Sequence, residues 1–218
     1  EKRSELRNAR NYIIKAVGDE ELENTLKKIQ KDFNDDVYSL LILHNKFESF
    51  YKSSMTKDEC YTALVKAAVE LTTPEAPKWE FIAARLLNYS FGKSLARELS
   101  ALGITGLYDK IRYLTDKGLY GDYILAHYSR AEIQEAETFI RKERDELFTY
   151  SGLELLLKRY VIRSHAGTPL ETPQEMFLGI SLHLAMNEEN NRMHWVRRFY
   201  DTLSSMEVTM ATPTMSNA

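Results

Sequence analysis

Thr212 and Ser216 carry hydroxyl side chains that can donate and accept hydrogen bonds. Thr212 directly precedes Pro213, and Ser216 follows it by three residues, in the run Ala-Thr-Pro-Thr-Met-Ser-Asn-Ala over residues 211–218. A hydroxyl and neighbouring backbone N–H groups can hydrogen-bond sugar or phosphate oxygens, and the proline ring fixes the local φ angle. The alternative is that Thr212 is only a strand-favouring residue, since β-branched side chains prefer strands.

Nucleophilic and metal-binding chemistry has little support in the sequence. Cys60 is the single cysteine, which excludes an internal disulfide and a CxxC motif. It falls inside an amphipathic helical pattern, where a buried cysteine behaves as a small hydrophobic side chain. Glu188, Glu189 and His194 are close in sequence, but their spacing suits no usual metal site. No HxxxH or ExxH pair occurs among the histidines, which are His44, His127, His165, His183 and His194.

The composition excludes several classes of protein. The chain has 218 residues, 44% of them hydrophobic, which is enough for a large core. A net charge of −3 gives no basic field for nucleic acid. No apolar run approaches the roughly 20 residues that cross a bilayer, and the charged N-terminus is unlike a signal peptide. We therefore expect a cytoplasmic protein with no nucleic-acid or membrane partner.

The apolar periodicity predicts a mainly α-helical fold. Capping boxes begin three helices, at Thr56 with Glu59, at Ser129 with Glu132, and at Thr172 with Glu175. A turn near His165–Pro169 suggests a small β-hairpin, and Gly103–Gly106 suggests a domain boundary. The helices are expected over residues 4–16, 20–31, 36–51, 56–73, 78–102, 107–116, 129–144 and 153–158, then from 172, with a further helix containing 199–204.

Three motifs follow one another in the last part of the sequence. They are a Pro-Gln-x-Met-Phe helix at 173–177, a Phe-Tyr-Asp-x-Leu-Ser helix at 199–204, and the 211–218 run as an extended strand. In this order they resemble the large (α) subunit of class I ribonucleotide reductase. Upstream segments extend the resemblance to roughly residues 40–218, namely Phe50-Tyr51, Lys66–Leu71, Ala76-Pro77, Ala83–Leu86, Leu107–Asp109, Thr138–Ile140 and Phe148–Gly152.

The resemblance implies two domains. Residues 1–103 would form a partial or degenerate ATP-cone-like helical region. Residues 104–218 would form a helical domain that leads into the first strand of a ten-stranded α/β barrel. Thr56 and Lys93 match ATP-contacting positions of complete cones. The alternative, which we favour, is that Thr56 is a helix N-cap and Lys93 a solvated surface lysine, because capping alone explains Thr56. A complete cone opens with a Lys-Arg-Asp-Gly-like turn, whereas Gly18-Asp19 here has no Lys-Arg before it.

The resemblance also implies a reaction whose catalytic residues this chain lacks. In the family, a cysteine thiyl radical, two reducing cysteines and a glutamate reduce a ribonucleotide to a deoxyribonucleotide for DNA synthesis. None of these catalytic residues matches a position here, so the chain would be inactive alone. Thr212 matches the residue that contacts the ribonucleoside diphosphate, and Ser216 is a possible neighbour. The complete enzyme would need the rest of the large subunit, a radical-generating, metal-containing β subunit and a thioredoxin- or glutaredoxin-type reductant.

Two other functions fit the sequence. One is a regulatory module that binds ATP or dATP without catalysis, and the other is a helical interaction module with no ligand of its own. The strand expected at Val208–Thr212 would have unpaired edges without the rest of the barrel. We therefore expect a frayed end or self-association there.

Overall fold

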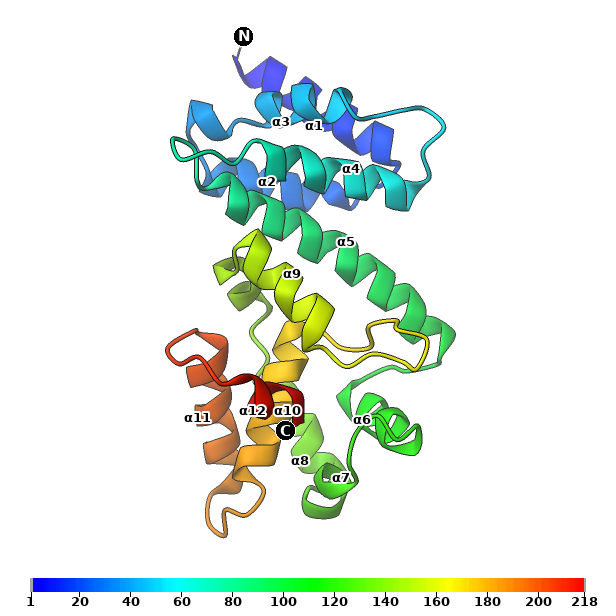
Figure 1. The fold of residues 1–218 in the computed structure, drawn as a ribbon, viewed down its shortest axis with the longest axis vertical. Helices are drawn as coiled ribbons and strands as arrows, with labels where there is room; N and C mark the ends of the chain where they lie inside the picture. The colour runs from blue at the N-terminus through cyan, green and yellow to red at the C-terminus, as the bar shows by residue number, and fades with distance from the viewer. Residues whose placement is uncertain (1, 218) are drawn as a thin grey trace. The chain divides into compact units, whose positions relative to one another are not determined.

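The computed structural model describes residues 2–217, and these are mainly α-helical, as predicted. The chain divides into two compact units (Figure 1). The first unit contains residues up to 93 together with 148–154, and the second contains the remaining described residues. Helices α5 (Trp79–Ala101) and α9 (Tyr150–Arg159) each contribute residues to both units.

The first unit is a set of helices around one apolar core. Helix α1 packs against α2, α3 and α4, and α3 also packs against α4 (Figure 1). The core contains the fully buried side chains of Phe47 and Trp79. Trp79 also donates from its indole Nε1 to the Val37 carbonyl oxygen at 3.1 Å. The elements are α1 (Lys2–Val17), α2 (Leu22–Asp32), η1 (Asp36–Tyr38), α3 (Leu40–Glu48), α4 (Lys57–Glu70) and the first part of α5.

The second unit is built around α10, which is buried on nearly all sides. Its residues are mostly apolar and are not confined to one face, as expected for a central helix. Helices α10 and α11 pack along each other (Figure 1), and η2 and α7 also contact α10. The elements are α6 (Leu107–Asp116), α7 (Tyr123–His127), α8 (Arg130–Glu137), η2 (Lys142–Leu147), the end of α9, α10 (Pro173–Ala185), α11 (Arg192–Ser204) and α12 (Thr212–Asn217).

The predicted helix starts are confirmed. Three capping boxes are present, at Thr56, Ser129 and Thr172. In each, the hydroxyl accepts from the backbone N–H three residues later, and the glutamate carboxylate at that position accepts from the backbone N–H of the cap residue. Gly18 ends α1 with φ of 70°, and its N–H donates to the Ile14 carbonyl oxygen at 2.8 Å. Glycine adopts this left-handed conformation without the steric cost that a Cβ atom imposes.

The predicted helix over 129–144 is wrong in its second half. Helix α8 ends at Glu137, and the 3₁₀ helix η2 begins at Lys142. Between them Phe139 is buried, and the Arg141 N–H donates to the Tyr200 hydroxyl at 2.8 Å. In a continuous helix the Arg141 N–H would donate to the carbonyl oxygen four residues earlier, and the bond to Tyr200 takes its place.

The β elements differ from expectation. The expected hairpin is reduced to a turn with one isolated antiparallel bridge, between Arg163 and Pro169. Residues 208–211 have no regular structure, and Thr212–Asn217 form α12 instead of continuing a strand. A strand needs a neighbour to satisfy its backbone groups. The described residues supply no such neighbour, so the segment forms hydrogen bonds within itself.

Candidate functional site

Thr212 and Ser216 lie one helical turn apart on α12. The Thr212 Oγ1 is 3.0 Å from the hydroxyl oxygen of Tyr160, at the end of α9. The Ser216 Oγ donates to the Thr212 carbonyl oxygen at 2.9 Å. Thr212 is exposed, so its hydroxyl is accessible to a ligand, whereas the proton of Ser216 is used within the helix. The sequence analysis did not predict a role for Tyr160, because no local sequence pattern relates it to Thr212, which lies 52 positions later.

Thr56 and Lys93, the two candidate effector contacts, lie in the first unit. Thr56 is the N-cap of α4, and its Oγ1 accepts from the Glu59 N–H at 3.3 Å. The Glu59 carboxylate in turn accepts from the Thr56 N–H at 2.7 Å, and this bond lowers the pKa of Glu59. Lys93 on α5 forms an ion pair with Glu21, and its Nζ is 3.9 Å from an oxygen of Asp19. Both side chains therefore have protein partners.

Asp19 forms a buried polar cluster that the sequence did not reveal. Its Oδ2 accepts from the hydroxyls of Tyr61 at 2.5 Å and Tyr89 at 2.6 Å. Its Oδ1 accepts from the Glu21 N–H at 3.2 Å. Burial alone would raise the pKa of Asp19, but the two tyrosine hydrogen bonds and Lys93 outweigh it and lower the pKa. The cluster joins the α1–α2 turn to α4 and α5.

A second buried cluster lies at the start of α10. The Lys110 Nζ is 2.7 Å from both carboxylate oxygens of Glu175, and Lys110 is only 3% exposed. The buried Glu171 accepts from the Ile162 N–H at 2.8 Å and faces the Tyr120 hydroxyl at 3.4 Å. Burial raises the pKa of Glu171 to about 8. The sequence contained one indication of this cluster. Lys110 follows Leu107 by three residues, and this spacing places the lysine on the buried face of α6.

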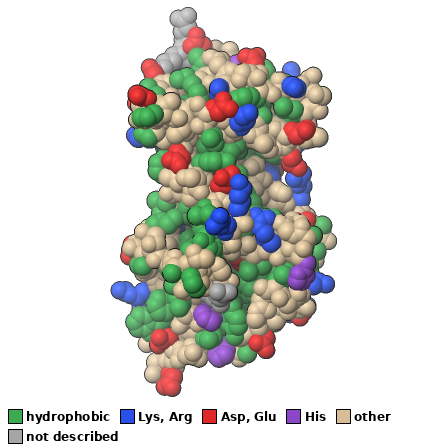
Figure 2. Space-filling view, in the orientation of Figure 1, with side chains coloured by type: hydrophobic (Ala, Val, Ile, Leu, Met, Phe, Trp, Pro, Cys, Tyr) green, Lys and Arg blue, Asp and Glu red, His purple; other side chains and the backbone are tan. Residues whose placement is uncertain are grey.

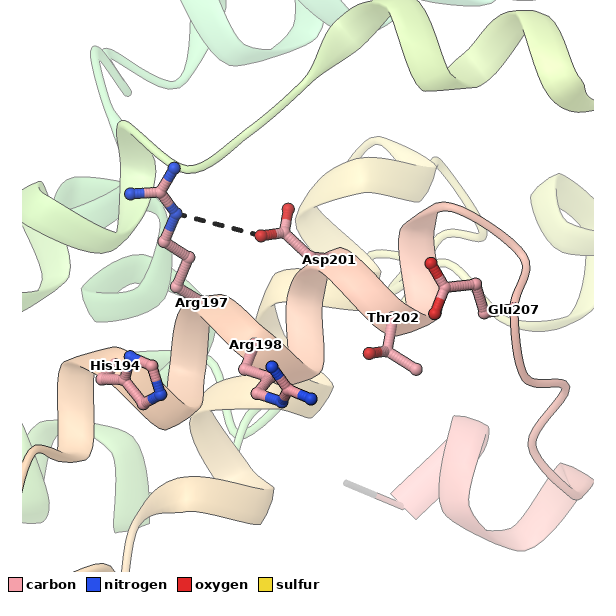
Figure 3. Close-up of a pocket in the computed structure, with 6 residues that line it drawn as sticks. All are labelled: His194, Arg197, Arg198, Asp201, Thr202 and Glu207. Carbon is pink, nitrogen blue, oxygen red and sulfur yellow. Dashed lines mark ion pairs between the residues drawn. The ribbon is translucent and has the colours of Figure 1, made fainter.

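A pocket of about 440 Å³ lies on α11 and the loop after it. In Figure 3, Arg198 lies between His194 and Thr202 along the helix, and Arg197 turns toward Asp201. The Arg197 Nε is 3.9 Å from Asp201, which also pairs with Arg144 at 2.9 Å. The full lining is His194, Arg197, Arg198, Asp201, Thr202 and Glu207. Its charges are of both signs, so the pocket selects no single ligand class.

Cys60 is buried and is a free thiol, in agreement with a structural role. Its Sγ donates to the Ala16 carbonyl oxygen at 3.6 Å, and burial, together with Glu59, raises the pKa of the thiol. Among residues 2–217, no three His, Cys, Asp or Glu side chains come together as a metal site. None of the described helices is both long and apolar enough to cross a membrane. On the face seen in Figure 2, acidic and basic side chains are interspersed over the first unit.

Comparison with known proteins relates this chain to ribonucleotide reductases. Residues 146–218 match the ribonucleotide reductase all-alpha domain. Over 216 residues the chain is 54% identical to the ribonucleoside-diphosphate reductase subunit alpha of Treponema pallidum, covering 99% of this chain and 26% of that protein. It is 32% identical over 175 residues to the corresponding subunit of Enterobacteria phage T4, covering 80% and 23%.

A third relative is subunit alpha of ribonucleoside-diphosphate reductase 1 of Escherichia coli. The identity is 28% over 169 residues, covering 77% of this chain and 22% of that protein. The chain thus spans about a quarter of the length of these relatives. Residues 146–218 match the all-alpha domain of ribonucleotide reductase, and the chain is homologous over nearly all of its length to the N-terminal part of ribonucleoside-diphosphate reductase alpha subunits.

Proposed function

We propose that this chain is the N-terminal part of a subunit that reduces ribonucleoside diphosphates to deoxyribonucleotides for DNA synthesis. The observation that carries the proposal is the 54% identity over 216 residues to a ribonucleoside-diphosphate reductase subunit alpha. The residues that perform the radical chemistry belong to the remainder of the subunit. The contribution of this chain is to help bind the substrate and to support the barrel.

Thr212 and Ser216 are the proposed substrate contacts. The exposed Thr212 hydroxyl can hydrogen-bond a ribose or phosphate oxygen of the nucleotide. In the complete subunit we propose that Val208–Thr212 pairs with a neighbouring barrel strand, and that the turn bridged by Arg163 and Pro169 extends into a hairpin. A partner strand would satisfy the backbone groups of residues 208–211, which form no regular structure here.

The proposed division is an ATP-cone-like region over 1–103 and the helical domain over 104–218. Thr56 and Lys93 are the proposed contacts of an ATP or dATP effector. Lys93 would supply a cation for an effector phosphate, and its Nζ lies 3.9 Å from an oxygen of Asp19. A phosphate must displace Glu21 from Lys93, so binding is expected to be weak and sensitive to salt.

The partners of the complete enzyme follow from the same proposal. A radical-generating small subunit would carry the metal. A thioredoxin- or glutaredoxin-type protein would supply the reducing electrons. We propose a cytoplasmic location, in which the buried Cys60 stays reduced.

The test is reduction of a ribonucleoside diphosphate by the complete subunit that contains this sequence, assayed with its small subunit and a dithiol. We expect deoxyribonucleotide formation, with a higher KM in Thr212→Val. Thr209→Val removes a hydroxyl from the same exposed segment and is the matched control. No reduction of any ribonucleoside diphosphate would overturn the proposed activity, whereas an unchanged KM in Thr212→Val would overturn only the substrate contact.

Calorimetric titration of the chain with ATP and dATP tests the effector site separately. We expect weak heats that Lys93→Met abolishes. Lys15→Met, at an exposed position of α1, is the control. The absence of heat from the unaltered chain would remove the effector proposal.

A further inference from the structure

Tyr160 connects the end of α9 to the proposed substrate residue. Its hydroxyl oxygen and the Thr212 Oγ1 are 3.0 Å apart, within hydrogen-bond distance. Among the described residues, the Thr212 hydroxyl has no second side-chain partner. Any constraint on the direction of this hydroxyl by another side chain therefore comes from Tyr160.

The backbone around Tyr160 is held firmly. The Tyr160 N–H donates to the Leu156 carbonyl oxygen at 3.0 Å, and Val161, the next residue, is 4% exposed. The Arg163 guanidinium donates to the carbonyl oxygens of Gly167, at 2.6 Å, and Leu157. The tyrosine ring thus extends from an anchored turn, whereas Thr212 lies at the start of a short, exposed helix.

We propose that Tyr160 is a positioning residue for Thr212, a role that rests on the proposed substrate contact. Each hydroxyl has one proton and can also accept. When Tyr160 donates to the Thr212 oxygen, the Thr212 proton is directed away from the ring and toward a ligand oxygen. Without the tyrosine hydroxyl the threonine hydroxyl rotates freely, and binding the substrate must then order it.

Ser216 cannot replace Thr212 in this arrangement. Its proton is donated to the Thr212 carbonyl oxygen at 2.9 Å, so it stabilises the first turn of α12. The geometry therefore assigns the donated substrate hydrogen bond to Thr212 and leaves Ser216 able to contact the substrate only as an acceptor.

The experiment is a double-mutant cycle in the complete subunit with its small subunit, using Tyr160→Phe, Thr212→Val and the double variant. We expect Tyr160→Phe to raise the KM for a ribonucleoside diphosphate roughly fivefold, the effect of losing about one hydrogen bond, with little change in kcat. The double variant should bind no worse than Thr212→Val, because the tyrosine acts through the threonine. Tyr113→Phe, a half-buried tyrosine on α6, is the control.

The outcomes separate the two proposals. If Thr212→Val raises the KM but Tyr160→Phe does not, the positioning role is wrong and the substrate contact stands. Additive effects of the two substitutions also contradict positioning. If Thr212→Val leaves the KM unchanged, the substrate contact itself fails. Equal melting temperatures of the variants and the unaltered subunit establish that the KM changes do not arise from unfolding.

Discussion

The Lys110 ammonium lies 2.7 Å from both carboxylate oxygens of Glu175, in a site where the lysine is 3% exposed. The same Glu175 carboxylate accepts from the Thr172 N–H at 2.7 Å and so caps α10. One carboxylate therefore both neutralises a buried cation and begins the central helix of the second unit.

Lys110→Met is expected to lower the free energy of unfolding by about 3–5 kcal/mol, because the Glu175 carboxylate would then lose the cation that it pairs with inside the protein. Urea denaturation followed by circular dichroism measures the loss, and hydrogen exchange of α10 amides assigns it to the second unit. Lys117→Met, at an exposed position, should change stability by less than about 0.5 kcal/mol. Equal urea midpoints for the two variants would contradict a stabilising role of the ion pair.

Glu171 should make the second unit less stable as pH rises. Its pKa is about 8 when folded and near 4.3 in an unfolded chain, so the folded state binds the extra proton between these values. The contribution of Glu171 to stability therefore falls by roughly 1 kcal/mol per pH unit across this window and levels off above it.

Glu171→Gln removes the titration and keeps a carbonyl acceptor for the Ile162 N–H. We expect the variant to unfold at a higher urea concentration than the unaltered chain at pH 8, with little difference at pH 4.5. The groups that face Glu171 are Tyr120, Tyr123, Lys110 and Glu175. A stability difference that does not vary with pH would show that another group controls the transition.

Gly179 on α10 is required by the close approach of Tyr120. A Cβ atom at this position would lie 2.4 Å from the tyrosine hydroxyl oxygen. We expect Gly179→Ala to lower stability by about 1–3 kcal/mol through this clash. In a Tyr120→Phe background the same change should be neutral or stabilising, since alanine favours a helix by about 1 kcal/mol. Thermal melts of the four proteins test this, and an equal cost in both backgrounds would contradict it.

Asp19 should be a stabilising anchor of the first unit. Asp19→Asn keeps only one oxygen, so either the two tyrosine hydroxyls, which share Oδ2, or the Glu21 N–H, which bonds Oδ1, loses its acceptor, at a cost of about 1–3 kcal/mol. Because the folded pKa is lowered, the contribution is complete above the unfolded pKa, near 3.9, and disappears as pH falls through the folded pKa. Thermal melts from pH 2 to 7 measure this. The exposed Glu20→Gln is the control, and matching pH profiles for both variants would refute the anchor.

Local patterns predicted most of the helices. The capping boxes at Thr56, Ser129 and Thr172 depend on residues three apart, so a sequence contains all the information they need. The buried Lys110 was also detectable, because it interrupts the apolar face of α6. The break between α8 and η2 was not, since the Arg141 N–H bonds to Tyr200, 59 residues away.

The sequence alone determined the mainly helical class, the helix starts and the resemblance that led to Thr212, because these follow from residues close together in the chain. Only the tertiary structure decided that Tyr160 meets Thr212, that Asp19 binds two tyrosines, and that Lys93 pairs with acidic side chains. It also decided that residues 212–217 are helical. Hydrogen bonds, ion pairs and strand pairing between distant segments depend on which surfaces meet after folding. The spacing of residues along the chain does not determine which surfaces these are.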